Sequence, residues 1–409
     1  MEVDDHDFKE IQSTNIINQY NKLKTITYDD GIEDEVNRGS VGKLKFNINI
    51  NHTIDELEES LRDNEFKDEI LSLITSCYSE GVTVKAAFKK LIFSFFDEYG
   101  LVIFNPLDKR IKDLLLPIFE KEIDNYSIHS KENVLRSAEL EENYHAQIKV
   151  SPINLFYSDK TGRYLLEPVD DEFRFRGKRT RISNDELKKL LYYDPSAFSP
   201  NVMLRPICQD FLFPTAVYVG GPSEICYFAQ VMPNYSFFNL VHPIVFPRSS
   251  ATILEKHISS SMKKYNILFN EFFFDEKDLV NTILNKIAEF DLDDIFNNSK
   301  TDINEILLKL RETLIEIDQS LLAASEKSLN KINQTLDILK VKSEDFQARK
   351  HDDVVKQLQK IRYFIYPGNN LQERELNFIY FANKYGLDFI KLLFSELITN
   401  KTDHQIIEL

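Results

Sequence analysis

Apolar and polar residues along the first third of this chain recur with two different periods, which predicts an α/β domain. The segment KLKFNINI, at 43–50, alternates with the period of two that is typical of a half-buried strand. Helical spacing predicts two amphipathic helices, at about 53–78 and 82–98. YGLVIFNP, at 99–106, resembles a buried parallel strand, and IKDLLLPIFEKEI follows it as a helix. Strands and helices that alternate in this way indicate an α/β layer.

The pattern changes at about residue 145. HAQIKV, NLFYSDKTGRYLLEPV and FRFRGKRTRI are short alternating segments, and DKTG between two of them is typical of a turn. We therefore expect hairpins that form an inserted β-rich module over 145–200.

The apolar positions near the C-terminus predict a coiled coil. From Ile303 onward they follow a four-three spacing, and a one-residue shift then restarts the register. The first series is 303, 307, 310, 314, 317 and 321, and the second is 322, 325, 329, 332, 336 and 339, with Ser325 as its polar member. The seam lies either inside a helical hairpin of one chain or between two chains, and periodicity does not choose between these alternatives.

Composition excludes several classes of partner. The 409 residues carry a net charge of −16, whereas binding to nucleic acid or to an anionic membrane depends on clustered Lys and Arg. We therefore expect no nucleic-acid partner and no membrane partner. No stretch approaches the roughly 18 apolar residues of a membrane span, and the N-terminus is acidic rather than basic as in a signal peptide.

The three cysteines are too few for a disulfide framework, and none of them forms a CxxC pair for zinc. This indicates a reducing cytoplasm. Cys208 and Cys226 flank the block of residues described next, and core packing is the interpretation we favour for them over a catalytic thiol.

Residues 201–230 mix charged and amide side chains with apolar runs that look buried. Arg205, Gln209, Asp210 and Glu224 interrupt these runs, and unpaired burial of such groups is unfavourable. Arg205, in an extended segment before proline, either forms a buried ion pair with an aspartate or holds a carboxylate or phosphate with its planar fork.

A glycine pair follows the strand-like TAVYV in the same block. Gly220 and Gly221 precede Pro222, which favours the first position of a helix, so the segment predicts strand, tight turn and helix start. Such a turn presents N–H groups to an anion, although a plain turn with Glu224 near the helix dipole is the alternative. Arg248, between proline and small residues, is either a ligand contact or an ordinary surface side chain.

Three further groups have weaker support from the sequence. DDHD at 4–7 offers three carboxylates and an imidazole that can bind Mg²⁺ or move protons, or it is simply an acidic, solvated helix start. Asn154 and Tyr157, in NLFY, are turn and core residues or part of a site. QER at 372–374 is expected to open the last helix. We prefer capping and inter-helix hydrogen bonding over catalysis as the role of these residues.

Five blocks of the chain together resemble one family. They are DDHDF at 4–8, NLFY at 154–157, LRPICQDFLFPTAVYVGGPSEICYFAQ at 204–230, FPRSSATILEKHI at 246–258 and LQERELNFIYFANKYG at 371–386. In this order they resemble the cysteine ligase family of bacillithiol biosynthesis, and the match covers nearly the whole chain.

The resemblance implies a Rossmann-like α/β core, an inserted β-rich connecting module and a C-terminal α-helical coiled-coil domain through which subunits pair as a homodimer. With these names, the predicted boundaries are 1–144 for the first part of the core, 145–200 for the module, 201–285 for the second part of the core, 286–366 for the coiled coil and 367–409 for C-terminal helices that pack on the core. In the family a glycine- and glutamine-rich segment precedes DHDF, whereas this sequence opens with MEVDDHDF. We expect either a late start codon or a truncated variant, and hence an N-terminally incomplete core.

The implied activity is formation of an amide between the carboxyl group of cysteine and the amine of glucosaminyl-malate. ATP is the expected activator of the carboxylate, and Mg²⁺ is a candidate cofactor. The implied catalytic residues are Asp5, His6 and Asp7, and the implied substrate- or nucleotide-binding residues are Asn154, Arg205, Gln209, Asp210, Gly220, Gly221, Glu224 and Arg248. The alternatives are a non-catalytic coiled-coil scaffold and an ATP-dependent amide ligase for another substrate.

Overall fold

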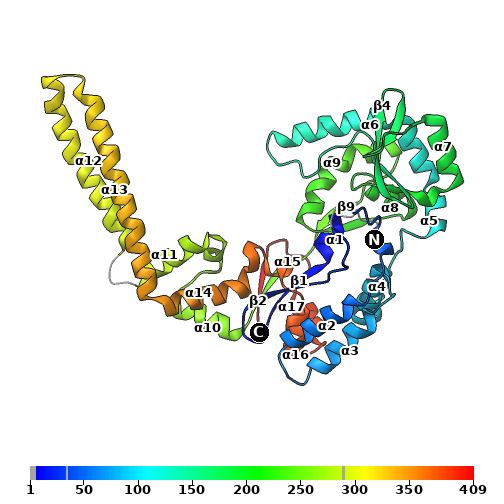
Figure 1. Ribbon diagram of the computed structural model, residues 1–409, viewed down its shortest axis with the longest axis horizontal. Helices are drawn as coiled ribbons and strands as arrows, with labels where there is room; N and C mark the ends of the chain where they lie inside the picture. The colour runs from blue at the N-terminus through cyan, green and yellow to red at the C-terminus, as the bar shows by residue number, and fades with distance from the viewer. Residues whose placement is uncertain (1–5, 34–35, 288–290) are drawn as a thin grey trace. The chain divides into compact units, whose positions relative to one another are not determined.

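The computed structural model describes residues 6–33, 36–287 and 291–409, and the chain forms two compact units (Figure 1). Both units are assembled from segments that are distant in sequence. The first contains the described residues up to Ile16, with Thr25–Ser250 and Asn377–His404, and the second contains Ile17–Lys24, Ala251–Leu376 and Gln405–Leu409. No helix of the described residues is long and apolar enough to cross a membrane.

One part of the first unit is mainly helical. Its elements are α1 (His6–Ile11), the hairpin strands β1 (Ser13–Ile17) and β2 (Leu23–Thr27), α2 (Asn49–Ser60), α3 (Lys67–Cys77), α4 (Val84–Phe96), α16 (Ile379–Tyr385) and α17 (Phe389–Glu396). The helix predicted at 53–78 is two helices, because the Asn64 side chain accepts a hydrogen bond from the Phe66 N–H and forms a turn between them. The helix predicted at 82–98 is confirmed as α4.

Two predicted strands in this part are wrong. Within 43–50 the structure has only an isolated bridge from Lys45 to Thr83, and the chain turns into α2 where the Asn47 carboxamide accepts the Asn49 N–H. The run at 99–106 forms no strand, and Val102 is 88% exposed. Phe104 of this run packs edge-on against Phe213 with ring centroids 4.8 Å apart, a contact that periodicity does not distinguish from burial in a strand.

The β-rich module is confirmed as an antiparallel sheet. Its five strands lie in the order β6-β5-β4-β3-β7. The strands are β3 (Leu155–Asp159), β4 (Gly162–Val169), β5 (Glu172–Phe175), β6 (Arg181–Ser183) and β7 (Phe198–Pro200), and α7 (Asn184–Tyr193) lies between the last two. The predicted turn joins β3 to β4, where Asp159 accepts the Thr161 N–H. HAQIKV, at 145–150, contributes no strand.

A β-α-β element follows the module. Strand β8 (Val217–Gly220) pairs in parallel with β9 (Ile244–Pro247), and α9 (Pro222–Phe238) connects them. Helices α5 (Lys109–Leu114), α6 (Leu116–Glu141) and α8 (Arg205–Leu212) complete this part, and α5 with α6 confirms the helix predicted after 106. Helices α6 and α9 and the five-stranded sheet share one apolar core, to which each of them contributes buried residues.

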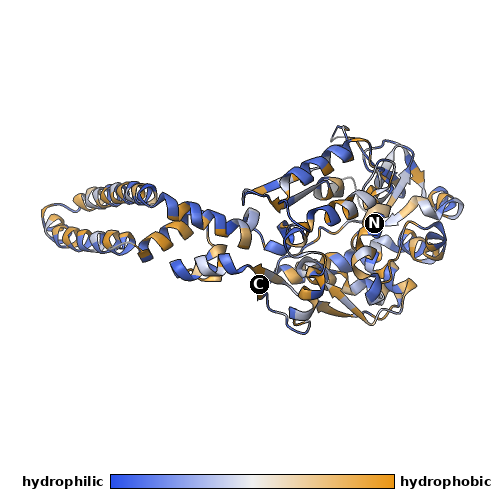
Figure 2. Ribbon diagram, turned by 90° about the horizontal axis from the view of Figure 1, so that it is seen from below, coloured by the Kyte–Doolittle hydropathy of each residue, from blue (hydrophilic) through white to orange (hydrophobic). Residues whose placement is uncertain are grey.

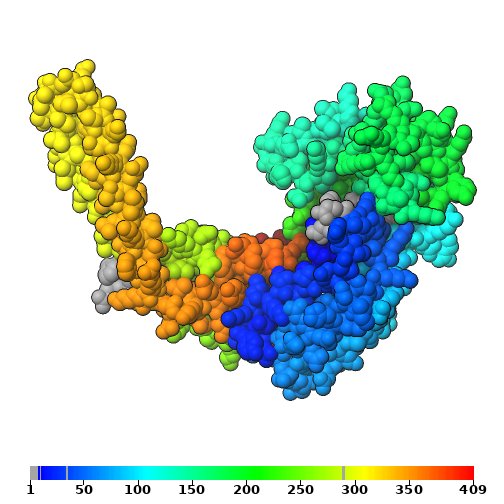
Figure 3. All heavy atoms as spheres, viewed as in Figure 1, coloured from blue at the N-terminus to red at the C-terminus, as the bar shows by residue number. Residues whose placement is uncertain are grey.

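The second unit contains a helical hairpin. Its helices are α10 (Lys256–Tyr265), α11 (Glu276–Ile287), α12 (Leu292–Ile317), α13 (Leu321–Lys350), α14 (Asp352–Ile365) and α15 (Gln372–Glu375), and its strands β10 (Ala251–Leu254) and β11 (Gln405–Glu408) pair in parallel. Helices α12 and α13 pack along their length (Figures 1 and 3). Ion pairs Lys300–Asp337 at 2.5 Å and Arg311–Glu326 at 2.6 Å join them.

The predicted coiled-coil seam therefore lies inside one chain. Helix α12 ends at Ile317 and α13 begins at Leu321, so the predicted one-residue shift in register falls at the start of the second helix. Most seam positions are half-buried, namely 303, 307, 314, 321, 322, 325, 329, 332 and 336, whereas 310, 317 and 339 are exposed. A repeat with a shift in the middle thus indicates two antiparallel helices and the turn between them.

A buried lysine in α5 gives a test of the core of the first unit. Burial lowers the pKa of Lys112 from 10.5 to about 8. As the pH rises from about 8 to 10.5, the folded protein has lost a proton that the unfolded chain still carries, so folding stability increases. The unaltered protein should gain up to about 3 kcal/mol relative to Lys112→Met over this range.

Urea unfolding at a series of pH values measures this difference. Lys109→Met is the matched control, because Lys109 lies in the same helix and is exposed. A stability difference between the unaltered protein and Lys112→Met that does not change with pH would contradict the prediction.

Candidate functional site

The turn between β8 and α9 is built as the sequence predicts. Strand β8 ends at Gly220, and α9 begins at Pro222. The Gly221 N–H donates to Glu224 Oε2 at 2.9 Å, so a carboxylate at the third helical position caps the helix start. Gly220 has little room for a side chain, because a Cβ there would lie 3.1 Å from the ring of Tyr218.

Arg205 reaches this turn from α8. Its Nη2 donates to Tyr227 Oη at 2.6 Å and lies 3.8 Å from Glu224 Oε1, which also accepts the Tyr218 hydroxyl at 2.6 Å. Arg205 itself begins α8, so the extended conformation predicted before proline is wrong. Pro206 fits the first turn of a helix because a proline there loses no helical hydrogen bond.

The surroundings favour the charged forms of the Arg205 guanidinium and the Glu224 carboxylate. Burial opposes the charge on Arg205, but Tyr227 and Tyr218 outweigh it and raise the pKa of the guanidinium. Burial likewise opposes the charge on Glu224, and hydrogen bonds from Tyr218 and the Gly221 N–H lower the pKa of the carboxyl. Arg205 and Glu224 are therefore both ionised at neutral pH.

Gln209 and Asp210 lie on the same helix as Arg205. Asp210 Oδ2 accepts the Tyr235 hydroxyl at 2.6 Å, and Gln209 Nε2 lies 3.5 Å from Asp210 Oδ1. Burial and this carboxylate raise the pKa of Tyr235. Among the described residues, Arg205 pairs with Glu224 rather than with an aspartate, and Asp210 is bonded to a tyrosine.

Arg248 follows β9 at the same end of the strand pair. Its N–H donates to the Gly220 carbonyl at 2.9 Å, and its Nη1 donates to the Ser249 carbonyl at 3.2 Å. Next to it, Ser250 Oγ and His404 Nδ1 lie 2.7 Å apart. The carboxyl ends of adjacent parallel strands are where α/β folds bind ligands, so this end of β8 and β9 is the candidate site.

Comparison with known proteins identifies the family. A family profile described as "Bacillithiol biosynthesis BshC, N-terminal Rossmann-like domain" matches residues 1–249, and one described as "Bacillithiol biosynthesis BshC, C-terminal coiled-coil domain" matches 251–409. The chain belongs to the BshC family. It therefore has a Rossmann-like N-terminal domain and a coiled-coil C-terminal domain.

Several relatives align with essentially all of this chain, and each bears the name "Putative cysteine ligase BshC". The relative from Salinibacter ruber is 33% identical over 100% of this chain and 74% of its own length. The relative from Chloroherpeton thalassium is 31% identical over 100% of this chain and 74% of its own length. The relative from Bacillus thuringiensis is 26% identical over 99% of this chain and 76% of its own length.

Asn154 is not part of the cluster at the BshC β8–α9 turn. It is fully buried, its N–H donates to Glu122 Oε1 at 2.6 Å, and its Oδ1 accepts from Asn201 Nδ2 at 2.8 Å. Glu122 in turn lies 2.7 Å from His129 Nε2. The side chain of Asn154 thus connects the start of β3 to the segment before α8.

The other predicted residues, which are the acidic motif, Gln372 and the cysteines, lie outside the cluster at the β8–α9 turn or outside the described residues. Asp5 lies outside the described residues; His6 and Asp7 open α1, and their side chains lie outside the described part. Gln372 bonds the backbone N–H and carbonyl of Ile253 and the Phe364 carbonyl, so inter-element hydrogen bonding is confirmed. Cys208 is buried, and burial raises the pKa of its thiol to about 12, which agrees with core packing. Core packing is wrong for Cys226, because this residue lies on the exposed side of α9.

The sequence missed the residues that connect the predicted ones. Tyr218 and Tyr227 lie within the block that was singled out, but their spacing gave no sign that both hydroxyls face one guanidinium. His404 lies in the last segment of the chain, far in sequence from Ser250. Within the described ranges, no group of three or more His, Cys, Asp or Glu side chains is placed to hold a metal ion.

Replacing Glu224 by Gln tests the cap at the start of α9. The change removes the charge that faces the helix N-terminus and Arg205, so it should lower the free energy of unfolding by about 1 kcal/mol at neutral pH. The pKa of Glu224 is lower in the folded protein than in the unfolded chain. The contribution of Glu224 to folding stability is therefore complete above its pKa in the unfolded chain, and it is lost as the pH falls through its pKa in the folded protein.

Thermal and urea unfolding at several pH values measure the effect of Glu224→Gln. Ser223→Ala is the control, because Ser223 is exposed in the same turn of α9. Equal stability of Glu224→Gln and the unaltered protein at neutral pH would show that the cap contributes nothing.

Proposed function

We propose that this BshC protein ligates cysteine to the amine of glucosaminyl-malate, the last step of bacillithiol biosynthesis, with ATP as the co-substrate that activates the cysteine carboxylate. Family membership and the name of the relatives, cysteine ligase, support the reaction class. We further expect this biosynthetic reaction to take place in the cytoplasm.

The observation that supports an anionic ligand at this site is the arrangement around Arg205. Its side chain is 42% exposed, and its contacts with the described residues all use Nη2. Nε and Nη1 therefore have no partner among these residues. A guanidinium with this pair of donors unused can bind a carboxylate or phosphate through two hydrogen bonds.

Amide formation needs an activated carboxyl group, because a carboxylate is a poor acylating agent. Transfer of a phosphoryl or adenylyl group from ATP to a carboxylate oxygen gives an acyl-phosphate or an acyl-adenylate. The amine then attacks the acyl carbon, the C–N bond forms, phosphate or AMP leaves with the former carboxylate oxygen, and the amine loses a proton. Both routes require groups that hold anions and one that accepts a proton.

The residues of this chain can be assigned to these tasks. Arg205 and Arg248 would hold the carboxylate or a phosphate, and the turn at Gly220 and Gly221 would face the same anion. Glu224 already occupies the Gly221 N–H, so the anion would contact other donors at this turn. His6 or Asp7 would accept the proton, and the acidic segment that contains them is our candidate for binding Mg²⁺.

Arg205→Ala tests the central role in this proposal. We expect kcat/KM for ATP-dependent formation of bacillithiol to fall by about 100-fold, because the variant leaves the anion without its charged donor. The measurement is thiol product formed from cysteine, glucosaminyl-malate and ATP by protein purified from its own cells. Arg179→Ala is the control, since Arg179 is exposed and distant in sequence from the site.

The outcomes separate the alternatives. Full activity of folded Arg205→Ala would remove Arg205 from the mechanism. Product formed with another amine, but not with glucosaminyl-malate, would favour a ligase for another substrate. No ATP-dependent product from the unaltered protein would contradict the ligase proposal and favour the scaffold.

The exposed faces of the helical hairpin support a homodimer, which we also propose. Ile306 and Ile317 on α12 are 64% and 71% exposed, and Phe346 on α13 is 68% exposed. Apolar and polar residues alternate along both helices (Figure 2). Exposed apolar residues that recur along a helix are typical of a surface that packs against another copy.

The double variant Ile306→Glu and Ile317→Glu should convert the dimer to a monomer, because the added charges would be buried without partners. Light scattering after size-exclusion chromatography measures the change, from twice the chain mass to 47.9 kDa. Lys309→Glu is the control, since it makes the same change in net charge at an exposed polar position. A monomeric unaltered protein would contradict the dimer.

A further inference from the structure

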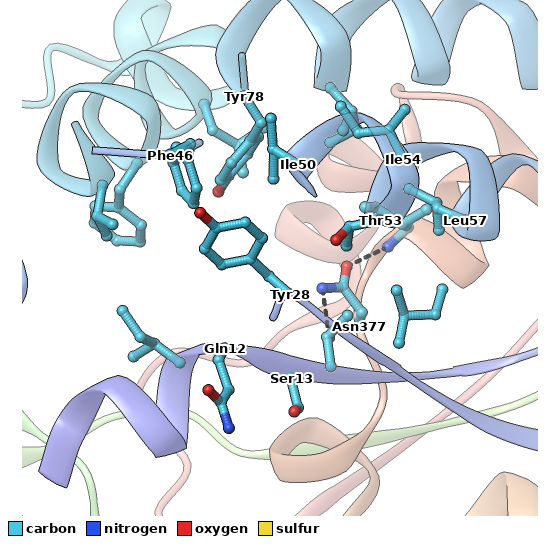
Figure 4. Close-up of a pocket in the computed structure, with 18 of the residues that line it drawn as sticks. Gln12, Ser13, Tyr28, Phe46, Ile50, Thr53, Ile54, Leu57, Tyr78 and Asn377 are labelled. Atoms are coloured by element: carbon cyan, nitrogen blue, oxygen red, sulfur yellow. Dashed lines mark hydrogen bonds between the residues drawn. The ribbon is translucent and has the colours of Figure 1, made fainter. Parts of the chain in front are cut away.

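An apolar cavity in the first unit lies apart from the site described above. It has a volume of about 380 Å³ and is bounded by α1, the β1–β2 hairpin, α2, α3, α4 and the start of α16 (Figure 4). This volume lies near the lower end of the about 300–1,000 Å³ that is usual for small-molecule sites. It is more than twice the roughly 150 Å³ of an engineered apolar cavity that binds benzene.

The cavity lies beside two small hydrophobic cores, and Ile54 and Tyr78 contact both of them. One wall is contributed by a core that includes Ile16, Leu57 and Ile74, and another by a core that includes Phe8 and Phe46. Side chains that face an unfilled space lose dispersion contacts on that side. An apolar occupant would restore these contacts.

The lining determines the charge of the occupant. Every lining residue that the structure describes is uncharged. The rings of Tyr28, Phe46 and Tyr78 lie together, with centroids 5.2 and 5.6 Å apart (Figure 4). A phosphate, a carboxylate or an amino acid would lose its hydration here without gaining a charged partner, so the occupant is not a substrate of the proposed ligation.

Most polar groups in the lining already have partners. Asn377 Nδ2 donates to Thr14 Oγ1 at 2.9 Å, and Thr53 Oγ1 donates to the Asn49 carbonyl at 3.3 Å. Gln12 and Ser13 also border the cavity, but their side chains extend from the strand away from the rings of Tyr28 and Phe46 (Figure 4).

We propose that this cavity binds an uncharged, largely apolar small molecule with a ring system. Ile11 and Phe88 are 41% and 46% exposed and lie where the lining meets solvent. Ile11 and Phe8 belong to α1, the helix that starts within the acidic motif of the family. The occupant therefore packs on the helix that carries this motif.

A matched pair of fluorescent probes tests the charge preference. N-phenyl-naphthylamine is neutral and carries one N–H, and anilinonaphthalene sulfonate has the same rings with an added sulfonate. The neutral probe should bind at least about tenfold more tightly to the unaltered protein, because the lining offers the sulfonate no cation. Equal binding of both probes, or no binding of the neutral one, would overturn the proposal.

Substitutions on one helix then locate the bound probe. Thr53→Phe fills the cavity from α2 and should weaken binding of the neutral probe about tenfold or more, by removing the space for apolar contact. Asp55→Phe places the same ring on the exposed face of α2 and should leave binding unchanged. Equal effects of the two variants would place the probe elsewhere and overturn the assignment.

A further variant keeps the test decisive. Should Thr53→Phe lower the melting temperature markedly, Leu91→Phe fills the cavity from α4 and carries the same expectation. Unchanged binding of the neutral probe to Leu91→Phe would then overturn the proposal.

Discussion

The hydrogen bond from the Gly221 N–H to Glu224 determines where α9 begins, and the geometry of the candidate site depends on it. Glu224 is held in place by the cap, and it accepts the Tyr218 hydroxyl and lies opposite Arg205. The cap thus connects a local rule of helix formation to the charge that the proposed chemistry needs.

Burial on the other side of α9 makes this arrangement rigid. Tyr235 and Phe228 are fully buried in the core that joins α6 to the sheet, and the Tyr235 hydroxyl holds Asp210 on α8. Since α8 carries Arg205, two helices that bring charges to the turn are joined through aromatic side chains. Aromatic residues with a polar end suit this role because they fill the core and also form hydrogen bonds.

The first unit contains two kinds of candidate ligand surface with opposite chemistry. Arginine and exposed donors at the ends of β8 and β9 suit anions, whereas the cavity beside the smaller cores has no charged lining among the described residues. One fold can hold both because they use different elements. The charged surface is built on a β-α-β element, and the cavity lies where α1 to α4 meet the β1–β2 hairpin.

The sequence by itself determined the elements whose start and end are set by local chemistry. The glycine pair before Pro222 fixed the β8–α9 turn, the DKTG turn fixed a hairpin, and the shifted heptads fixed two helices of the hairpin. These signals are local because backbone conformation and helix capping depend on neighbouring residues. The five matching blocks also identified the family.

Only the tertiary structure decided which side chains meet. Phe104 packs on Phe213 and does not lie in a strand, and Asn154 is buried against Glu122 rather than placed at the turn. Arg205 pairs with Glu224 and two tyrosines, and the apolar cavity is lined by residues between 8 and 91 and by residues 377–379. Each of these depends on the packing of residues far apart in sequence, which periodicity and motif spacing do not encode.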